Sequence, residues 1–274
     1  MEKKAKHKVW KPDEIIRDLA IEEPDEIDLI AIGSLLSAKI RCSNLDGAAA
    51  TLVGAGDEAL ITVKGTDVEN LTPRQRFSVG HELGHWMYDR ERATFECQER
   101  IFVTAWGKEP GIDPERVANN YAADLLMPRK MFTSKAMGKP ITFDSVDELS
   151  QLFKTSATST VIRLVELGSS YAFACCVEEG RRTWFARNLD VAENLYPTRR
   201  PSRESLAYRM HNDLVTGKES LAIVPATAWF DVDSAKGVSL VENSRRLTRD
   251  LTLSLLYWSS EAEYFRLVEE PEDE

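Results

Sequence analysis

The residues His81, Glu82, Leu83, Gly84 and His85 form an HExxH pattern. Two histidines four positions apart lie about 40° apart around an α-helix, so both imidazoles can bind one metal ion. Glu82 lies about 100° from His81 around the same helix, which places its carboxylate beside the ion and not on it. From there a carboxylate can take a proton from a metal-activated water. The pattern predicts a metal-dependent hydrolase in which Glu82 is the general base.

A catalytic zinc site needs a third protein ligand and an open position for water. Glu115 is the best candidate, because it begins a second predicted helix and Asn119 follows one turn later on the same face. An asparagine placed there can orient a metal ligand by a hydrogen bond. Spacing alone leaves open four other glutamates, which are Glu91, Glu96, Glu99 and Glu109. Two histidines and one glutamate suit zinc, with manganese or iron as alternatives.

Two helices with clear start signals carry these residues. The segment TPRQ at 72–75 combines an N-cap threonine, a proline at the first helical position and a glutamine at N3. This helix should continue to about residue 90 and hold both histidines. Asp113 and Pro114 are the same signals for the second helix, which should stop at Pro128.

Other segments show weaker periodic patterns. Apolar spacing predicts a helix over 26–40, and two short helices around a turn at 154–156 that end at Gly168. Strands are expected at 47–53, 58–65, 171–177, 182–188, 220–231 and 251–258, with a further helix near 202–213. This mixture predicts an α+β protein with boundaries near residues 138 and 168.

The composition is that of an acidic globular protein. The chain has 274 residues and a formal net charge of −10, with 43% hydrophobic and 29% charged residues. Its apolar runs are far shorter than a membrane span, and no secretory signal is recognisable. The four cysteines lack CxxC spacing, and Cys175 and Cys176 are adjacent in an expected buried strand. These features favour reduced thiols and a cytoplasmic location, with no membrane partner.

Two segments resemble the paired signatures of the ImmA/IrrE metallopeptidases. They are RQRFSVGHELGHW (74–86) and ERVANNYAADLLMP (115–128), and the strand-like segment LDGAAATLVGAGDEALITV (45–63) is also similar to that family. The resemblance implies a zincin-like fold with Glu115 as the third ligand of the metal. Several relatives carry an additional histidine where this chain has Asp89, so the resemblance assigns no role to that position.

A weaker resemblance covers LSQLFKTSATSTVIRLVELGSSYAFACCV (149–177), which is similar to the three-part radiation-response members. It implies a zincin-like metallopeptidase domain at 1–138, a helix-turn-helix-like helical hairpin at 139–168 and a mixed α/β GAF-like domain at 169–274. The family resemblance also implies a partner: limited, regulatory cleavage of an intracellular helix-turn-helix repressor.

Two rival functions use the same segments. A DNA-binding regulator is suggested by the helical pair, but residues 140–168 carry a net charge of −2 and the second helix has one arginine for base edges. Direct DNA binding is therefore not expected. The other rival is a sensor or scaffold with a vestigial metal site. For the oxyanion, Tyr88 and His211 are candidates, although a packing role is expected for Tyr88.

Overall fold

The computed structural model describes residues 8–89 and 113–268, and these divide into two compact units. Unit 1 comprises the described residues up to 135 together with 150–156, and unit 2 comprises 136–149 and 157–268. Both combine helices with one sheet, which confirms the predicted α+β class. The division passes through the predicted helical hairpin, and the scheme with boundaries near 138 and 168 stays a prediction.

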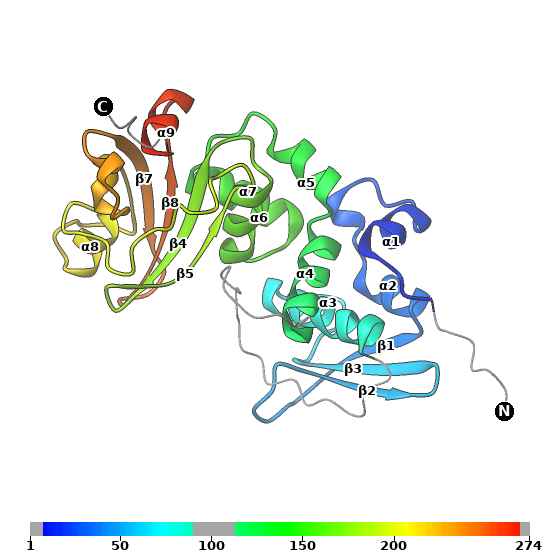
Figure 1. Cartoon of the computed structure of the whole chain (residues 1–274). Coiled ribbons are helices and arrows are strands. Elements are labelled where there is room, and N and C mark those ends of the chain that lie inside the picture. The colour runs from blue at the N-terminus through cyan, green and yellow to red at the C-terminus, as the bar shows by residue number, and fades with distance from the viewer. Residues whose placement is uncertain (1–7, 90–112, 269–274) are drawn as a thin grey trace. The chain divides into compact units, whose positions relative to one another are not determined.

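Unit 1 places helix α3 between a three-stranded sheet and helix α4 (Figure 1). The strand order is β1-β3-β2, with β1 parallel and β2 antiparallel to the central strand. In chain order the elements are α1 (Pro12–Asp18), η1 (Pro24–Glu26), α2 (Leu29–Leu35), β1 (Ala38–Ser43), β2 (Ala50–Ala55), β3 (Glu58–Lys64), α3 (Pro73–Tyr88), α4 (Pro114–Leu126) and α5 (Arg129–Ala136).

Helix α3 is fixed at both ends. The backbone N–H of Gln75 donates to the hydroxyl of Thr72, and the Gln75 side chain accepts in return from the Thr72 N–H, which is the predicted capping box. One turn on, Arg76 donates to the Ile27 carbonyl. Near the other end, the indole of Trp86 donates to the Leu36 carbonyl at 2.8 Å. These bonds fix the rotation of α3 and hence the direction in which its histidines point.

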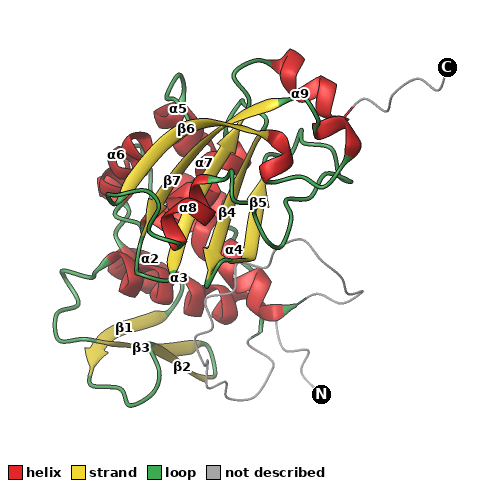
Figure 2. Cartoon of the chain, turned by 90° about the vertical axis from the view of Figure 1, so that its left-hand side faces the viewer, coloured by secondary structure: helices red, strands yellow, loops and turns green. Residues whose placement is uncertain are grey.

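Unit 2 is built on a five-stranded antiparallel sheet with the order β5-β4-β8-β7-β6. Figure 2 shows α8 and α7 on opposite faces of this sheet. The elements are α6 (Phe143–Phe153), which crosses the division between the units, α7 (Ala157–Leu167), β4 (Ala172–Glu178), β5 (Arg181–Arg187), α8 (Leu206–His211), β6 (Glu219–Pro225), η2 (Ala226–Ala228), η3 (Asp233–Ala235), β7 (Ser239–Arg246), β8 (Leu251–Tyr257) and α9 (Glu261–Val268).

Strand β4 is buried on both faces. Phe173, Cys175 and Val177 join the core cluster that also contains Trp229, while Cys176 on the opposite face is 5% exposed. Burial raises the pKa of both adjacent thiols, to about 11 for Cys176. The pair is therefore an element of packing, as the apolar setting in the sequence indicated.

Several elements differ from the sequence expectations. The segment 26–40 forms a helix only to Leu35, and strand β1 begins at Ala38 after Ser37 adopts a positive φ of 55°. The periodic pattern continued across this turn because β1 also has alternating buried residues. Helices α1, α5 and α9 and strand β7 were not expected from the sequence. Among the described helices none is both long enough and apolar enough to cross a membrane.

Candidate metal centre

Small residues allow α3 and α4 to cross at close range. A Cβ atom added to Gly84 would lie 2.8 Å from the Cα atom of Ala118, closer than real Cβ atoms approach other atoms. At Gly80 the added atom would lie 3.2 Å from the Cα atom of Ala122. Glycine in the middle of a helix costs about 1 kcal/mol relative to alanine. Here the absence of a side chain at these two positions allows the helix with the histidines to approach the helix with Glu115.

The crossing brings the three predicted ligands together. The Nε2 atoms of His81 and His85 are 3.1 Å apart, and one carboxylate oxygen of Glu115 lies 3.3 Å from the first and the other 3.4 Å from the second. His85 is buried, His81 is partly buried, and the Glu115 side chain is half exposed. The cluster is therefore most exposed on the side of Glu115.

Hydrogen bonds outside the cluster fix the tautomer of each histidine. The Nδ1 atom of His81 lies 2.9 Å from Oδ1 of Asn119, and Nδ1 of His85 lies 2.9 Å from Oδ2 of Asp89. Both oxygens accept hydrogen bonds, so each imidazole donates through Nδ1–H. A neutral imidazole that donates through Nδ1 has its lone pair on Nε2. Both lone pairs are thus available inside the cluster.

A metal ion fits this donor set. With metal–ligand distances of about 2.0–2.1 Å, two ligands of a tetrahedral zinc lie about 3.3–3.4 Å apart. The three distances among His81, His85 and Glu115 are 3.1, 3.3 and 3.4 Å. Two nitrogen lone pairs and a carboxylate at such distances repel one another unless a cation or a proton lies between them. The donor set suits zinc and also accepts manganese or iron.

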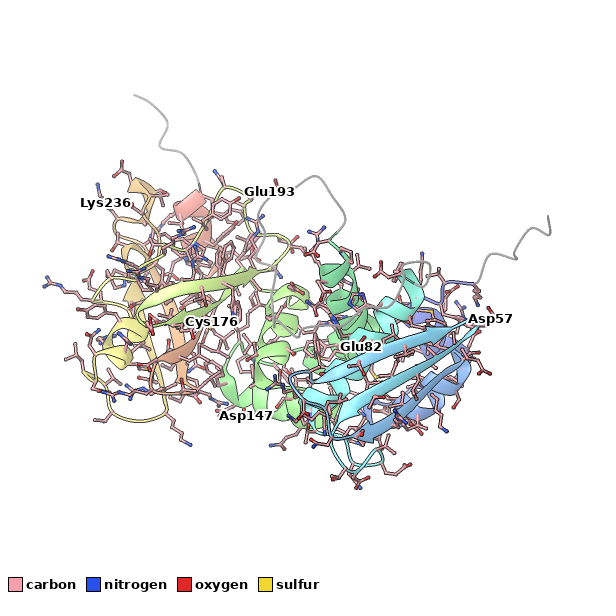
Figure 3. All side chains as sticks on the ribbon, turned by 90° about the horizontal axis from the view of Figure 1, so that it is seen from below. Asp57, Glu82, Asp147, Cys176, Glu193 and Lys236 are labelled. Atoms are coloured by element: carbon pink, nitrogen blue, oxygen red, sulfur yellow. The ribbon has the colours of Figure 1, made fainter. Side chains whose placement is uncertain are left out.

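Glu82 lies beside this cluster on the same turn of α3. Its residue is 2% exposed, and Figure 3 labels it among the helices of unit 1. A buried carboxylate next to a metal-activated water is suited to accept and return a proton. Glu82 therefore has the position that the HExxH spacing predicts for a base, and its catalytic role stays a prediction.

The oxyanion candidates have other contacts. Tyr88 is 48% exposed, and its ring packs edge-on against Tyr121 with the centroids 6.1 Å apart. His211 ends helix α8 of unit 2, where its ring lies close to Gly180. The structure supplies a packing contact for each residue, and an oxyanion role for either is still untested. The rival ligands Glu91, Glu96, Glu99 and Glu109 lie outside the described residues.

Sequence reasoning missed Asp89 and the glycines of α3. Asp89 follows His85 by four residues and caps the helix, so its carboxylate reaches the ring from one turn below. This i, i+4 spacing was visible in the sequence and is the signal that could have identified it. The sequence alone does not show that a glycine is required at position 84. That requirement depends on the position of Ala118 in helix α4, which only the folded chain reveals.

Comparisons with known proteins address the same region. Residues 68–165 match the family described as the IrrE N-terminal-like domain of peptidases. No curated protein matches the chain. A solved structure of a Mycobacterium tuberculosis transcriptional regulator is similar over 96% of this chain and 90% of that chain, with 11% identity and a TM-score of 0.56. At that identity the likeness concerns the fold alone. The match of residues 68–165 to the IrrE N-terminal-like domain agrees with the resemblance to the ImmA/IrrE metallopeptidases.

Proposed function

We propose that the protein is a metal-dependent endopeptidase that cuts one intracellular protein, a helix-turn-helix repressor, at a single site. The observation that carries the proposal is the convergence of His81, His85 and Glu115, whose donor atoms have the spacing of zinc ligands. The family match to a peptidase domain supports it independently. The choice of a repressor as substrate rests on the family resemblance, and the acidic charge of the chain supports it.

The chemistry divides between the ion and the protein. A zinc ion held by the three ligands would polarise a scissile carbonyl and lower the pKa of a water. Glu82 accepts the proton of the attacking water and then gives it to the leaving amine. Asn119 and Asp89 keep both imidazole rings in the tautomer and the orientation that bind a cation. Burial of Glu82 and His85 limits competing water at the reacting atoms.

Charge supports a basic protein as the substrate. The chain carries a net charge of −10, and DNA-binding repressors are basic on the surface that contacts phosphates. Opposite charges raise the rate of encounter more than they raise affinity. Electrostatic attraction therefore brings a basic protein to the site more often than other proteins. The site can select one partner in this way without a deep binding pocket.

The helical pair supports cleavage over direct DNA binding. Arg163, the one arginine of helix α7, is only 5% exposed. A side chain buried in this way is not available to read bases in a groove. The pair instead packs into the fold, where Phe132 of α5 contacts Phe153 of α6 with ring centroids 5.3 Å apart.

The proposal is tested with zinc-loaded protein, the helix-turn-helix repressor encoded beside its gene and casein as a general substrate. We expect two discrete repressor fragments, intact casein, and no fragments with Glu82→Gln. Digestion of both proteins would contradict the regulatory role and leave the metal site in place. An intact repressor, together with duplex DNA binding in a gel-shift assay, would instead favour a regulator with a vestigial site.

A further inference from the structure

The two edges of the sheet in unit 2 are protected differently. At the β5 edge the backbone N–H of Arg182 donates to the carbonyl of Arg199 at 2.8 Å, so a neighbouring segment covers this edge. At the β6 edge Leu221 is 54% and Ile223 is 71% exposed. Proteins usually cover an edge strand or give it charged side chains, because its free backbone groups pair with other strands. Strand β6 has a charged residue only at its start, Glu219, and a proline at its end, Pro225, with two exposed apolar side chains between them.

The hydrogen bonds to β7 show which backbone groups of β6 are free. Arg246 N–H donates to the Lys218 carbonyl, and Ala226 N–H donates to the Val238 carbonyl, at 2.7 and 2.8 Å. These pairs belong to the β6–β7 register, so the even-numbered residues of β6 point their backbone groups at β7. The odd-numbered residues, including Leu221, therefore point theirs outwards. No hydrogen bond to this outer edge comes from another backbone within residues 8–89 and 113–268.

We propose that two copies of the protein associate through antiparallel pairing of β6 with β6, which joins their two sheets into one. A twofold axis at Ala222 places Leu221 of each copy opposite Ile223 of the other. The outward N–H and C=O groups of these residues then pair, because both are odd-numbered. Their four apolar side chains meet on one face of the joined sheet, and none of them remains as exposed as in the single copy.

Charge favours this register over the one centred on Leu221, and a proline ends its pairing. An axis at Leu221 would place Glu219 opposite the apolar Ile223. With the axis at Ala222, Glu219 lies opposite Pro225, which has a carbonyl to accept its N–H and no N–H of its own, so the pairing ends there. The Glu219 carboxylate is already paired with Arg245 of its own chain at 2.7 Å. No like charges are opposed across the axis, which matters in a chain with a net charge of −10.

A second copy fits the edge because the strand is self-complementary. A twofold interface uses the same residues on both sides, so each donor must find an acceptor within one short sequence. Strand β6 meets that condition at its centre, with apolar side chains opposite apolar side chains. An unrelated strand would need to supply the same pattern by chance. The protein should therefore be a dimer in solution.

Sedimentation velocity of the full-length protein tests the association. We expect dimers to form at or below about 100 µM protein, in keeping with a small interface. Ile223→Lys should weaken the association by at least about tenfold, because the ammonium would be buried against Leu221. Leu189→Lys is the matched control, since Leu189 is 62% exposed in the same unit but lies outside the strands. At a protein concentration low enough for the wild type to be monomeric, thermal unfolding should be unchanged in both variants.

Cross-linking tests the register directly. In the proposed pairing the two copies of Ala222 face each other across a non-hydrogen-bonded pair, where Cα atoms are about 4.5 Å apart and a disulfide can form. Ala222→Cys should give a reducible dimer, whereas Ser220→Cys should not, because it faces Val224. A protein that stays monomeric at about 100 µM would overturn the proposal. So would a dimer that Ile223→Lys does not weaken, or a cross-link at Ser220→Cys without one at Ala222→Cys.

Discussion

Glu82 in unit 1 and Glu242 in unit 2 are both buried carboxylates, 2% and 0% exposed, but their surroundings differ. Glu242 accepts hydrogen bonds from the backbone of Leu206 and Ala207, the indole of Trp229 and the hydroxyl of Ser244, all at 2.8–2.9 Å. Burial raises the pKa of Glu242, and these four donors oppose that rise. The carboxylate joins helix α8 to the sheet.

Glu82 lies instead beside a cluster of lone pairs. Its neighbours His81 and His85 present Nε2 atoms at 3.1 Å from each other, a geometry that requires a cation or a proton between them. A buried carboxylate is therefore structural where neutral donors converge on it and suited to chemistry where it adjoins a cation site. Burial alone does not distinguish the two cases. The comparison predicts opposite consequences for the same substitution.

The largest effect should come from Glu82→Gln. The amide cannot accept the water proton, so the rate of repressor cleavage should fall by about 10²–10⁴-fold or more. The unfolding temperature should change little, because the amide has the same shape. Cleavage rates and thermal unfolding of the same zinc-loaded preparation check this. A variant that cuts at the wild-type rate would show that another group is the base.

The same change at Glu242 should affect stability and not chemistry. In Glu242→Gln an NH₂ group replaces one carboxylate oxygen and faces two donors, which should lower the free energy of unfolding by about 2–4 kcal/mol. Metal content and cleavage rate should be unchanged. Urea unfolding with a metal assay measures both. If Glu242→Gln is as stable as the wild type, the four hydrogen bonds do not hold α8 in place.

This difference also explains what the sequence could reveal. The HExxH spacing and the capping signals at Thr72 and Asp113, together with the family resemblance, predict Glu82 as the base and the three ligands from the sequence alone. Those signals are local, because one or two helical turns contain them. The donors to Glu242 come from residues 206, 207, 229 and 244, so only the folded chain identifies its role.

Strands β1 and β7 were not predicted from the sequence, and in both the reason is physical. Strand β1 is short and follows α2 closely, after a residue in the left-handed region, so its pattern merged with that of the helix. Strand β7 carries Glu242, Asn243 and Ser244 as buried residues in its centre. In a sequence, consecutive polar residues do not indicate a strand inside a sheet. These three polar side chains can be buried here because they form hydrogen bonds with residues of other elements.

Gly84→Ala tests whether close crossing of α3 and α4 assembles the site. The new methyl would lie 2.8 Å from the Cα atom of Ala118, so the helices must separate. Metal affinity should fall by at least about tenfold and stability by about 1–3 kcal/mol. Gly80→Ala is the matched control, with a milder contact of 3.2 Å to Ala122, and should lose less. Equal affinities for both variants and the wild type would contradict this account.

Smaller effects are expected from the residues that orient the histidines. Asn119→Ala and Asp89→Ala each remove one hydrogen bond to an Nδ1 atom, which should weaken metal affinity or activity by about 10–100-fold without abolishing either. Competition with a chelator of known zinc affinity measures the loss. Asp89→Asn keeps an acceptor oxygen and should therefore retain much of the wild-type metal affinity. Wild-type metal affinity in both alanine variants would show that Asn119 and Asp89 do not orient the histidines for metal binding.

The most direct test of the central claim is calorimetric titration of zinc into metal-free protein. The wild type and Glu82→Gln should each bind one ion with similar affinity, because Glu82 lies beside the cluster and is not a ligand. His81→Ala and Glu115→Ala should bind at least about 100-fold more weakly, since each loses a group that contacts the ion. Unchanged zinc binding by His81→Ala or Glu115→Ala would contradict the assignment of the metal centre to the crossing of α3 and α4.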